Sequence, residues 1–76
     1  MKLSDLKQNQ VAKITNLNCD LDLKQRFYSF GINKNSLIVV ENISFSKNTI
    51  EINVEDTFIA LRMEEAKCIE VEVVNQ

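Results

Sequence analysis

The 76-residue sequence contains no histidine and a single glycine. Histidine is the commonest general base and the commonest ligand of transition metals, so its absence removes the simplest acid–base and metal chemistry. Phosphate-binding loops of the types G-x-x-x-x-G-K and G-x-G-x-x-G need more than one glycine, which excludes a nucleotide site of this kind. The serines and cysteines have no base partner that can be identified by residue type. We therefore do not expect an enzyme.

Long apolar runs and clusters of one charge are also lacking. No run approaches the ~18 residues that cross a bilayer, and the first residues lack the apolar segment of a secretory signal. We therefore expect a cytoplasmic protein that does not insert into the membrane. The nine Lys and Arg are scattered along a chain with a net charge of −2, so no basic stripe is available to neutralise phosphates. We expect no nucleic-acid partner.

Cys19 and Cys68 are the only cysteines. Two thiols in a chain without a secretory signal are expected to be free and reduced, so we predict no disulfide. Cys19 lies close to Asp20 and Asp22, and a ferrous ion can use thiolate and carboxylate ligands. Acidic residues just before a helix are, however, favoured by capping and by the helix dipole alone. Because no closed set of four ligands is present, we predict no metal-binding residue and no cofactor.

Length and composition predict one globular domain over residues 1–76, with 45% hydrophobic and 26% charged residues. A helix is predicted from Asp22, which has capping-box spacing to Gln25, up to Gly31, whose position suits a left-handed helix end. Leu23, Phe27 and Phe30 form its apolar stripe. Strand-like runs occupy residues 11–17, 37–40, 48–54, 58–61 and 68–74, with helical turns at 3–6 and 62–67.

This order contains no strand–helix–strand repeat, and five short strands are best stabilised by curling around one core. The sequence therefore predicts a mainly β fold: a small, partly open five-stranded barrel with one short helix after the first strand and a helical turn before the last. With one glycine, other left-handed backbone positions are expected to fall on asparagines such as Asn9, Asn35 and Asn48. Glu64 and Glu65 are expected on a solvated helical face.

Three segments in the same order and spacing resemble the FeoA family of ferrous-iron transport proteins. They comprise residues 3–6 with 11–14, residues 23–32, and residues 59–62 with 65–66 and 69–71. The family commonly has glycine in the first turn and proline-glycine after the helix, where this chain has Asn9 and Lys34-Asn35. The resemblance implies an SH3-like barrel that docks on the cytoplasmic region of the membrane transporter FeoB and modulates iron uptake.

Tyr28 and Arg26 are the candidate partner-binding residues. Tyr28 lies about 130° around the helix from the apolar stripe and is expected to face outward, while Arg26 lies about 60° from the stripe centre. Tyrosine and arginine are enriched in interfaces, although Tyr28 could equally lie against neighbouring loops. The alternative function is a free-standing transition-metal-binding or sensing domain, similar to the barrel attached to metal-dependent repressors.

Overall fold

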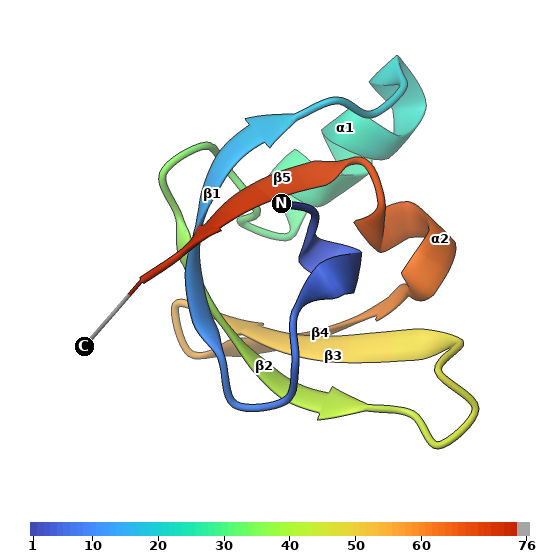
Figure 1. Ribbon diagram of the computed structural model, residues 1–76. Helices are drawn as coiled ribbons and strands as arrows, with labels where there is room; N and C mark the ends of the chain where they lie inside the picture. Colours follow the sequence, from blue (N-terminus) through green and yellow to red (C-terminus); the bar gives the residue numbers. More distant parts are fainter. Residues whose placement is uncertain (75–76) are drawn as a thin grey trace.

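Five antiparallel strands form one curled sheet in the computed structural model, which describes residues 1–74 (Figure 1). The strand order is β4-β3-β2-β1-β5, and the short helical turn η1 lies inside the curve of the sheet. The elements are η1 (Leu3–Asp5), β1 (Val11–Leu17), α1 (Leu21–Ser29), β2 (Leu37–Ile43), β3 (Thr49–Val54), β4 (Thr57–Arg62), α2 (Met63–Ala66) and β5 (Ile69–Val73). The predicted mainly β, partly open barrel is confirmed.

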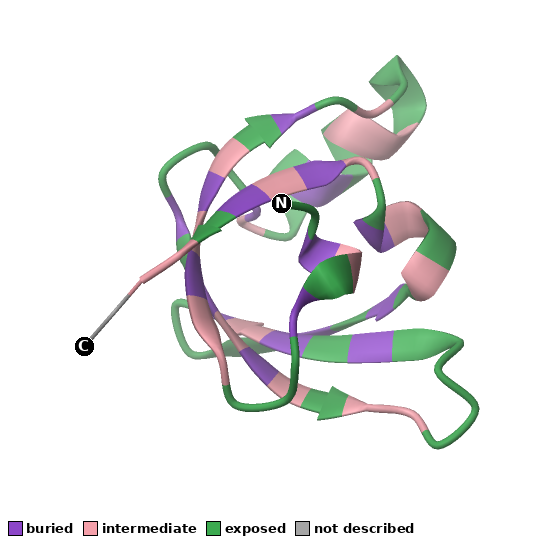
Figure 2. Ribbon diagram, viewed as in Figure 1, coloured by how far each residue is buried: buried purple, intermediate pink, exposed green. Residues whose placement is uncertain are grey.

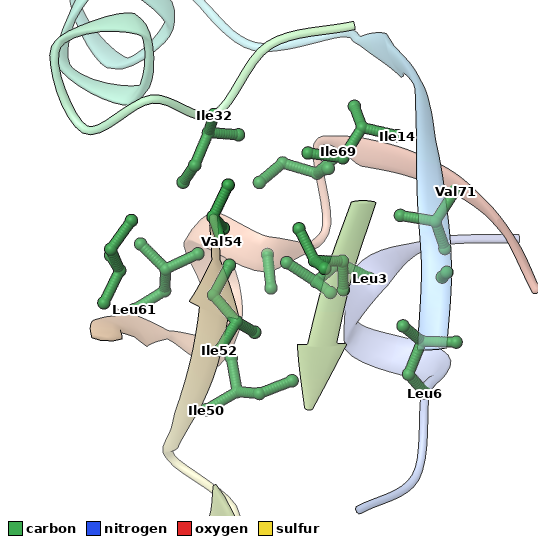
Figure 3. Packing of buried hydrophobic residues seen from close by; sticks show 14 of the residues in the cluster. Leu3, Leu6, Ile14, Ile32, Ile50, Ile52, Val54, Leu61, Ile69 and Val71 are labelled. Carbon is green, nitrogen blue, oxygen red and sulfur yellow. The ribbon is translucent and has the colours of Figure 1, made fainter. Parts of the chain in front are cut away.

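The core follows from the alternation along the strands. Ile50, Ile52 and Val54 of β3 are buried, and the side chains between them face outward, as the sequence pattern predicted (Figure 2). Side chains from all eight elements and from the segments between them meet in a single interior (Figure 3). The buried set is Leu3, Leu6, Ala12, Ile14, Leu17, Phe27, Ile32, Ile38, Val40, Ile50, Ile52, Val54, Ile59, Leu61, Ala66, Ile69 and Val71.

Two register shifts bend the sheet. One lies in β1 between Ile14 and Asn16, where it pairs with β5, and the other in β2 between Val40 and Asn42, where it pairs with β3. An extra residue on one strand of an antiparallel pair increases the local bend and twist. These irregularities allow five short strands to curl around the core. β2 continues past residue 40, where the predicted strand stopped, because Asn42 and Ile43 still pair with β3 after the shift.

Left-handed backbone occurs at Gly31 (φ 87°), Asn9 (φ 73°) and Asn35 (φ 75°), as predicted. The prediction for Asn48 is wrong, because the left-handed residue of that loop is Lys47 (φ 61°). Ser44 closes the loop: its carbonyl accepts from the Lys47 N–H at 2.8 Å, and its hydroxyl accepts from the Asn48 N–H at 3.1 Å. This places the turn one residue earlier than the residue type suggested. The expectation that left-handed positions fall on asparagines is also wrong between β3 and β4, where Glu55 (φ 51°) and Asp56 (φ 67°) are left-handed.

The predicted start of α1 is also wrong. The N-cap is Asp20, whose Oδ1 accepts from the backbone N–H of Leu23 at 2.9 Å, so α1 begins at Leu21 and not at Asp22. Gly31 ends the helix as predicted, but Phe30 is 41% exposed and does not continue the apolar stripe. The left-handed turn at Gly31 redirects the chain, so that Ile32, which follows it, is buried in the core instead.

Cys19 and Cys68 form a disulfide, with their Cα atoms 5.0 Å apart, so the prediction of two free thiols is wrong. The cause is the register of the barrel. β1 pairs with β5 so that Leu17 lies opposite Ile69, and the Asn18 N–H donates to the Cys68 carbonyl at 2.8 Å. The chain therefore leaves β1 at the place where it enters β5, and the two cysteines lie side by side although 49 positions separate them.

Candidate protein-interaction surface

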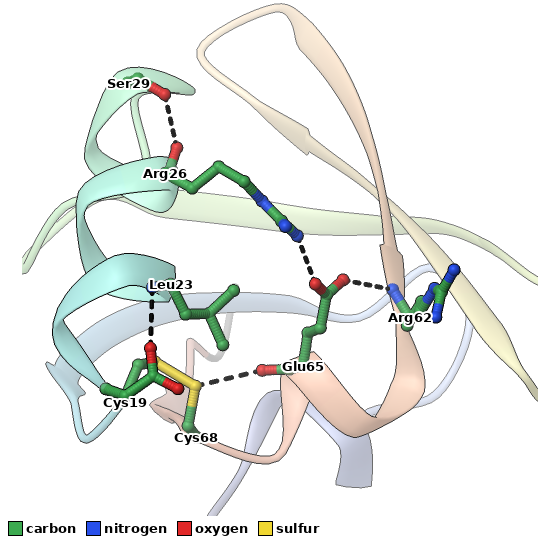
Figure 4. A network of polar contacts seen from close by, with 8 residues as sticks. Cys19, Leu23, Arg26, Ser29, Arg62, Glu65 and Cys68 are labelled. Carbon is green, nitrogen blue, oxygen red and sulfur yellow. Dashed lines mark hydrogen bonds and ion pairs between the residues drawn. A yellow bond between two sulfur atoms is a disulfide. The ribbon is translucent and has the colours of Figure 1, made fainter.

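Helix α1 is attached to the barrel along one side. Phe27 is fully buried, and Leu23 is partly buried against the core. The N-cap at Asp20 fixes the first turn, and the disulfide of Cys19 lies immediately before it (Figure 4). The remaining sides of the helix are free to present side chains to solvent.

Arg26 points from α1 across to α2. Its Nη2 forms an ion pair and hydrogen bond with Oε2 of Glu65 (Figure 4). The other oxygen of Glu65, Oε1, accepts from the backbone N–H of Arg62 at 3.0 Å and caps α2. Glu65 therefore links the two helices, whereas its sequence context suggested only a solvated face.

The electrostatics of this link involve opposing effects. Partial burial raises the pKa of Glu65, but hydrogen bonds from the Arg62 backbone and the Arg26 side chain lower it. The charges of Arg26 and Arg62 act in the same direction, and the net result is a pKa below the ordinary value for glutamate. The carboxylate is thus held in its charged form by the two arginines.

The Arg26–Glu65 pair separates two surface hollows. One, of about 540 Å³, lies beside the first turns of α1 and is lined by Asp20, Leu21, Asp22, Leu23, Arg26 and Glu65. The other, of about 530 Å³, extends to β4 and is lined by Arg26, Thr49, Ala60, Leu61, Arg62 and Glu65. Both hollows combine apolar and charged side chains, as surfaces that bind proteins commonly do.

Tyr28 is 47% exposed, which agrees with its predicted outward orientation. The structure does not bring it together with Arg26, because residues two apart on a helix point to different sides. Its helical neighbour at i−7 is Leu21, which is 68% exposed. Leu21 and Tyr28 therefore expose two apolar side chains, two turns apart, on the same side of α1, and we call this pair of residues the Leu21–Tyr28 strip. Sequence reasoning missed Leu21, although its spacing from Tyr28 was the available signal.

A further aromatic pair was also missed. Phe30, at the end of α1, and Phe58, on β4, line one hollow of about 480 Å³ together with Ser29, Thr57, Ile59 and Ala60. Phe58 is 63% exposed. Its neighbour Ile59 is buried, so Phe58 occupies an outward-facing position of β4. An aromatic residue at such a position was the sequence signal that could have identified Phe58.

Two members of the group Cys19, Asp20 and Asp22 are engaged in other contacts, and Asp22 is exposed. Cys19 is in the disulfide, and the carboxylate of Asp20 caps α1. Within residues 1–74 no three His, Cys, Asp or Glu side chains are placed to hold one metal ion. In the same part of the chain, no helix has both the length and the apolar character needed to cross a membrane.

Comparison with known proteins identifies the family. The FeoA domain matches residues 1–73. A relative in Campylobacter jejuni, named "Putative Fe(2+) transport protein A", is 39% identical over 74 residues, which are 97% of this chain and 100% of the relative. The FeoA protein of Chlorobium tepidum has a similar structure, with a TM-score of 0.94 at 25% identity, covering 99% of this chain and 71% of that protein.

The same fold occurs in part of a manganese-dependent transcriptional repressor solved with manganese. The TM-score is 0.89 at 17% identity, and the match covers 97% of this chain and 36% of the repressor, so this likeness concerns the fold alone. The predicted SH3-like fold is confirmed by these structures. Because the family match and the relative both extend over nearly all of residues 1–74, the chain belongs to the FeoA domain family.

Proposed function

We propose that this protein is a cytoplasmic accessory subunit of ferrous-iron uptake, which docks on the cytoplasmic region of a FeoB-type membrane transporter and modulates it. The observation that carries the proposal is the match to the FeoA domain over residues 1–73, together with a full-length relative named for Fe(2+) transport. In this proposal the GTPase of the transporter supplies the chemistry. The chain itself contributes a binding surface and no catalytic group.

The surface that we assign to docking is α1, with Tyr28 and Arg26 as its binding residues. Tyr28 belongs to the exposed Leu21–Tyr28 strip, whose burial against a partner would remove apolar surface from water. Arg26 borders the hollows on both sides of the Arg26–Glu65 pair, and about half of its side chain is exposed. Tyrosine and arginine are both enriched in interface hot spots, and a partner that covers α1 from more than one side would contact both.

The test is a calorimetric titration of the purified protein with the isolated cytoplasmic region of the transporter. Tyr28→Ala should weaken binding by ~2 kcal/mol or more, roughly thirtyfold, as truncation of a central interface aromatic does. Arg26→Ala should also weaken it. Circular dichroism melts of each variant should show little change for Tyr28→Ala, because this side chain lies away from the core.

Phe45→Ala is the matched control, since Phe45 is an exposed aromatic in the loop between β2 and β3. It should bind like wild type. Failure of the wild-type protein to bind at all would refute docking. If Tyr28→Ala and Arg26→Ala bind normally whereas Glu64→Lys on α2 does not, the docking surface is α2 and the assignment to α1 is wrong.

The alternative is a free-standing domain that binds or senses a transition metal. The fold shared with a manganese-dependent repressor favours it, but of the candidate ligands near α1 Cys19 is engaged in the disulfide and Asp20 in the helix cap. Elemental analysis after anaerobic loading with ferrous iron separates the two functions. We expect no stoichiometric iron. One retained equivalent that disappears on Cys19→Ser would favour the alternative.

A further inference from the structure

The Cys19–Cys68 disulfide lies at the two junctions that position α1 and α2. Cys19 stands between β1 and the N-cap of α1, and Cys68 stands between the C-cap of α2 and β5. One covalent bond therefore fixes the start of α1 to the end of α2 (Figure 4). Both cysteines pack against the core but are only partly buried, so a dissolved thiol can approach them.

The contacts that would remain after reduction lie elsewhere on α1. Phe27 and the Arg26–Glu65 pair anchor the second half of the helix. The first turn depends on Leu23, on the Asp20 cap and on the disulfide, while Leu21 in this turn is exposed. Cleavage of the disulfide would therefore loosen the first turn selectively and leave the rest of the helix in place.

The surroundings of Cys68 suit a thiol as well as a disulfide. Its Sγ lies 3.2 Å from the carbonyl oxygen of Glu65. A sulfur in a disulfide has no hydrogen to donate, but a Cys68 thiol could donate to this oxygen from its present position once the Cys19 sulfur has moved out of bonding distance. The hydrogen bond from Asn18 to the Cys68 carbonyl and the pairing of β1 with β5 involve only the backbone. The barrel can therefore persist in both redox states.

We propose that Cys19 and Cys68 form a reversible dithiol–disulfide site, whose reaction partner is the cellular thiol glutathione. A thiolate of the partner attacks one sulfur and breaks the S–S bond, which gives a mixed disulfide and one free cysteine. A second partner thiol then attacks the mixed disulfide and releases the other cysteine. In total the protein gains two electrons and two protons, and the partner thiols become a disulfide. Disulfides in reducing compartments commonly have such transient, sensing roles.

The consequence rests on the proposed docking function. In the disulfide state the first turn of α1 is fixed, and the Leu21–Tyr28 strip has one geometry, which reduces the entropy lost on binding. In the dithiol state this turn must be ordered by the partner. The disulfide form should therefore dock more tightly, by about tenfold.

The first experiment uses this protein alone. It is equilibrated in glutathione buffers from mainly reduced to mainly oxidised, and free thiols are trapped by alkylation and counted by mass spectrometry. We expect complete conversion in both directions. On reduction, hydrogen exchange should rise more in residues 20–24 than in β2 and β3, where only the smaller increase due to lower global stability is expected. A disulfide that glutathione does not reduce in the native state, one that does not re-form, or reduction that unfolds the barrel would each overturn the proposal.

The second experiment titrates both redox forms with the cytoplasmic region of the transporter, with Cys19→Ser/Cys68→Ser as a permanently unlinked control. We expect the reduced form and the double variant to bind equally, and both about tenfold more weakly than the disulfide form. Equal binding by all three would overturn the link between redox state and docking. Absence of binding by all three would refute the proposed function, whereas the redox site would still be supported by the first experiment.

Discussion

Replacing Phe27 with alanine should remove much of the stability of this protein. Phe27 is the only residue of α1 that is fully buried, so its ring supplies most of the contact between the helix and the core. Truncation of a buried phenylalanine typically costs ~3–5 kcal/mol, through lost burial and the cavity left behind. A chain of 76 residues is expected to have a total stability of roughly 4–11 kcal/mol. The variant should therefore be marginally stable or unfolded.

The assay is urea denaturation followed by circular dichroism, with Phe30→Ala and Phe58→Ala as matched controls. These two variants lose the same atoms at positions that are 41% and 63% exposed. Each should cost less than Phe27→Ala, because part of each side chain is already in solvent and less burial is lost, and Phe58→Ala, at the more exposed position, should cost the least. An unchanged urea midpoint for Phe27→Ala would refute the packing of α1. So would an equal cost for Phe30→Ala.

Three further effects on stability are expected. Reduction of the Cys19–Cys68 disulfide, which spans 49 positions, should lower the free energy of unfolding by about 4 kcal/mol, measured by urea denaturation with and without a dithiol. The folded-state pKa of Glu65 lies below its unfolded value. Its contribution to the free energy of unfolding is therefore full above the unfolded pKa of about 4.3 and is lost as the pH falls through the folded pKa. Glu65→Gln should flatten this part of the pH profile of the urea midpoint. Gly31→Ala should lower the stability by about 1–2 kcal/mol in a thermal melt, because a residue with a Cβ is strained at a φ of 87°. No atom lies within 4 Å of the added Cβ, so the cost comes from the backbone and not from a clash. Gly31→Asn should cost less.

The strands were predictable because their signal is local. Alternation of apolar and polar residues along β3 and β5 reports one buried face directly, and it needs no knowledge of the neighbouring strand. The start of α1 was less certain, since Asp20 and Asp22 both have a side chain that can cap a helix. Only the path of the chain out of β1 determines that Asp20 reaches the Leu23 N–H.

The disulfide could not be predicted from the sequence, because it depends on strand register. Leu17 lies opposite Ile69 only after the sheet has curled far enough for the first and last strands to pair. The prediction of two free thiols followed from the compartment in which the protein was expected. That rule describes where disulfides persist, and it does not indicate whether two cysteines lie close together in the fold. The fold determines whether the two cysteines lie close together, and the redox conditions of the compartment determine whether the pair is oxidised.

The two candidate binding residues differ in what their substitution can show. Helical geometry was sufficient to place Tyr28 outward, but it could not reveal that Arg26 contacts Glu65, which lies 39 positions later in the chain. Removing Arg26 leaves the Glu65 carboxylate with only the Arg62 backbone as a partner and loosens the link between α1 and α2. Weaker docking of Arg26→Ala could therefore come from a lost contact or from a displaced helix. Glu65→Gln weakens the same link while keeping the guanidinium, so only a loss of affinity larger in Arg26→Ala than in Glu65→Gln assigns Arg26 to the interface.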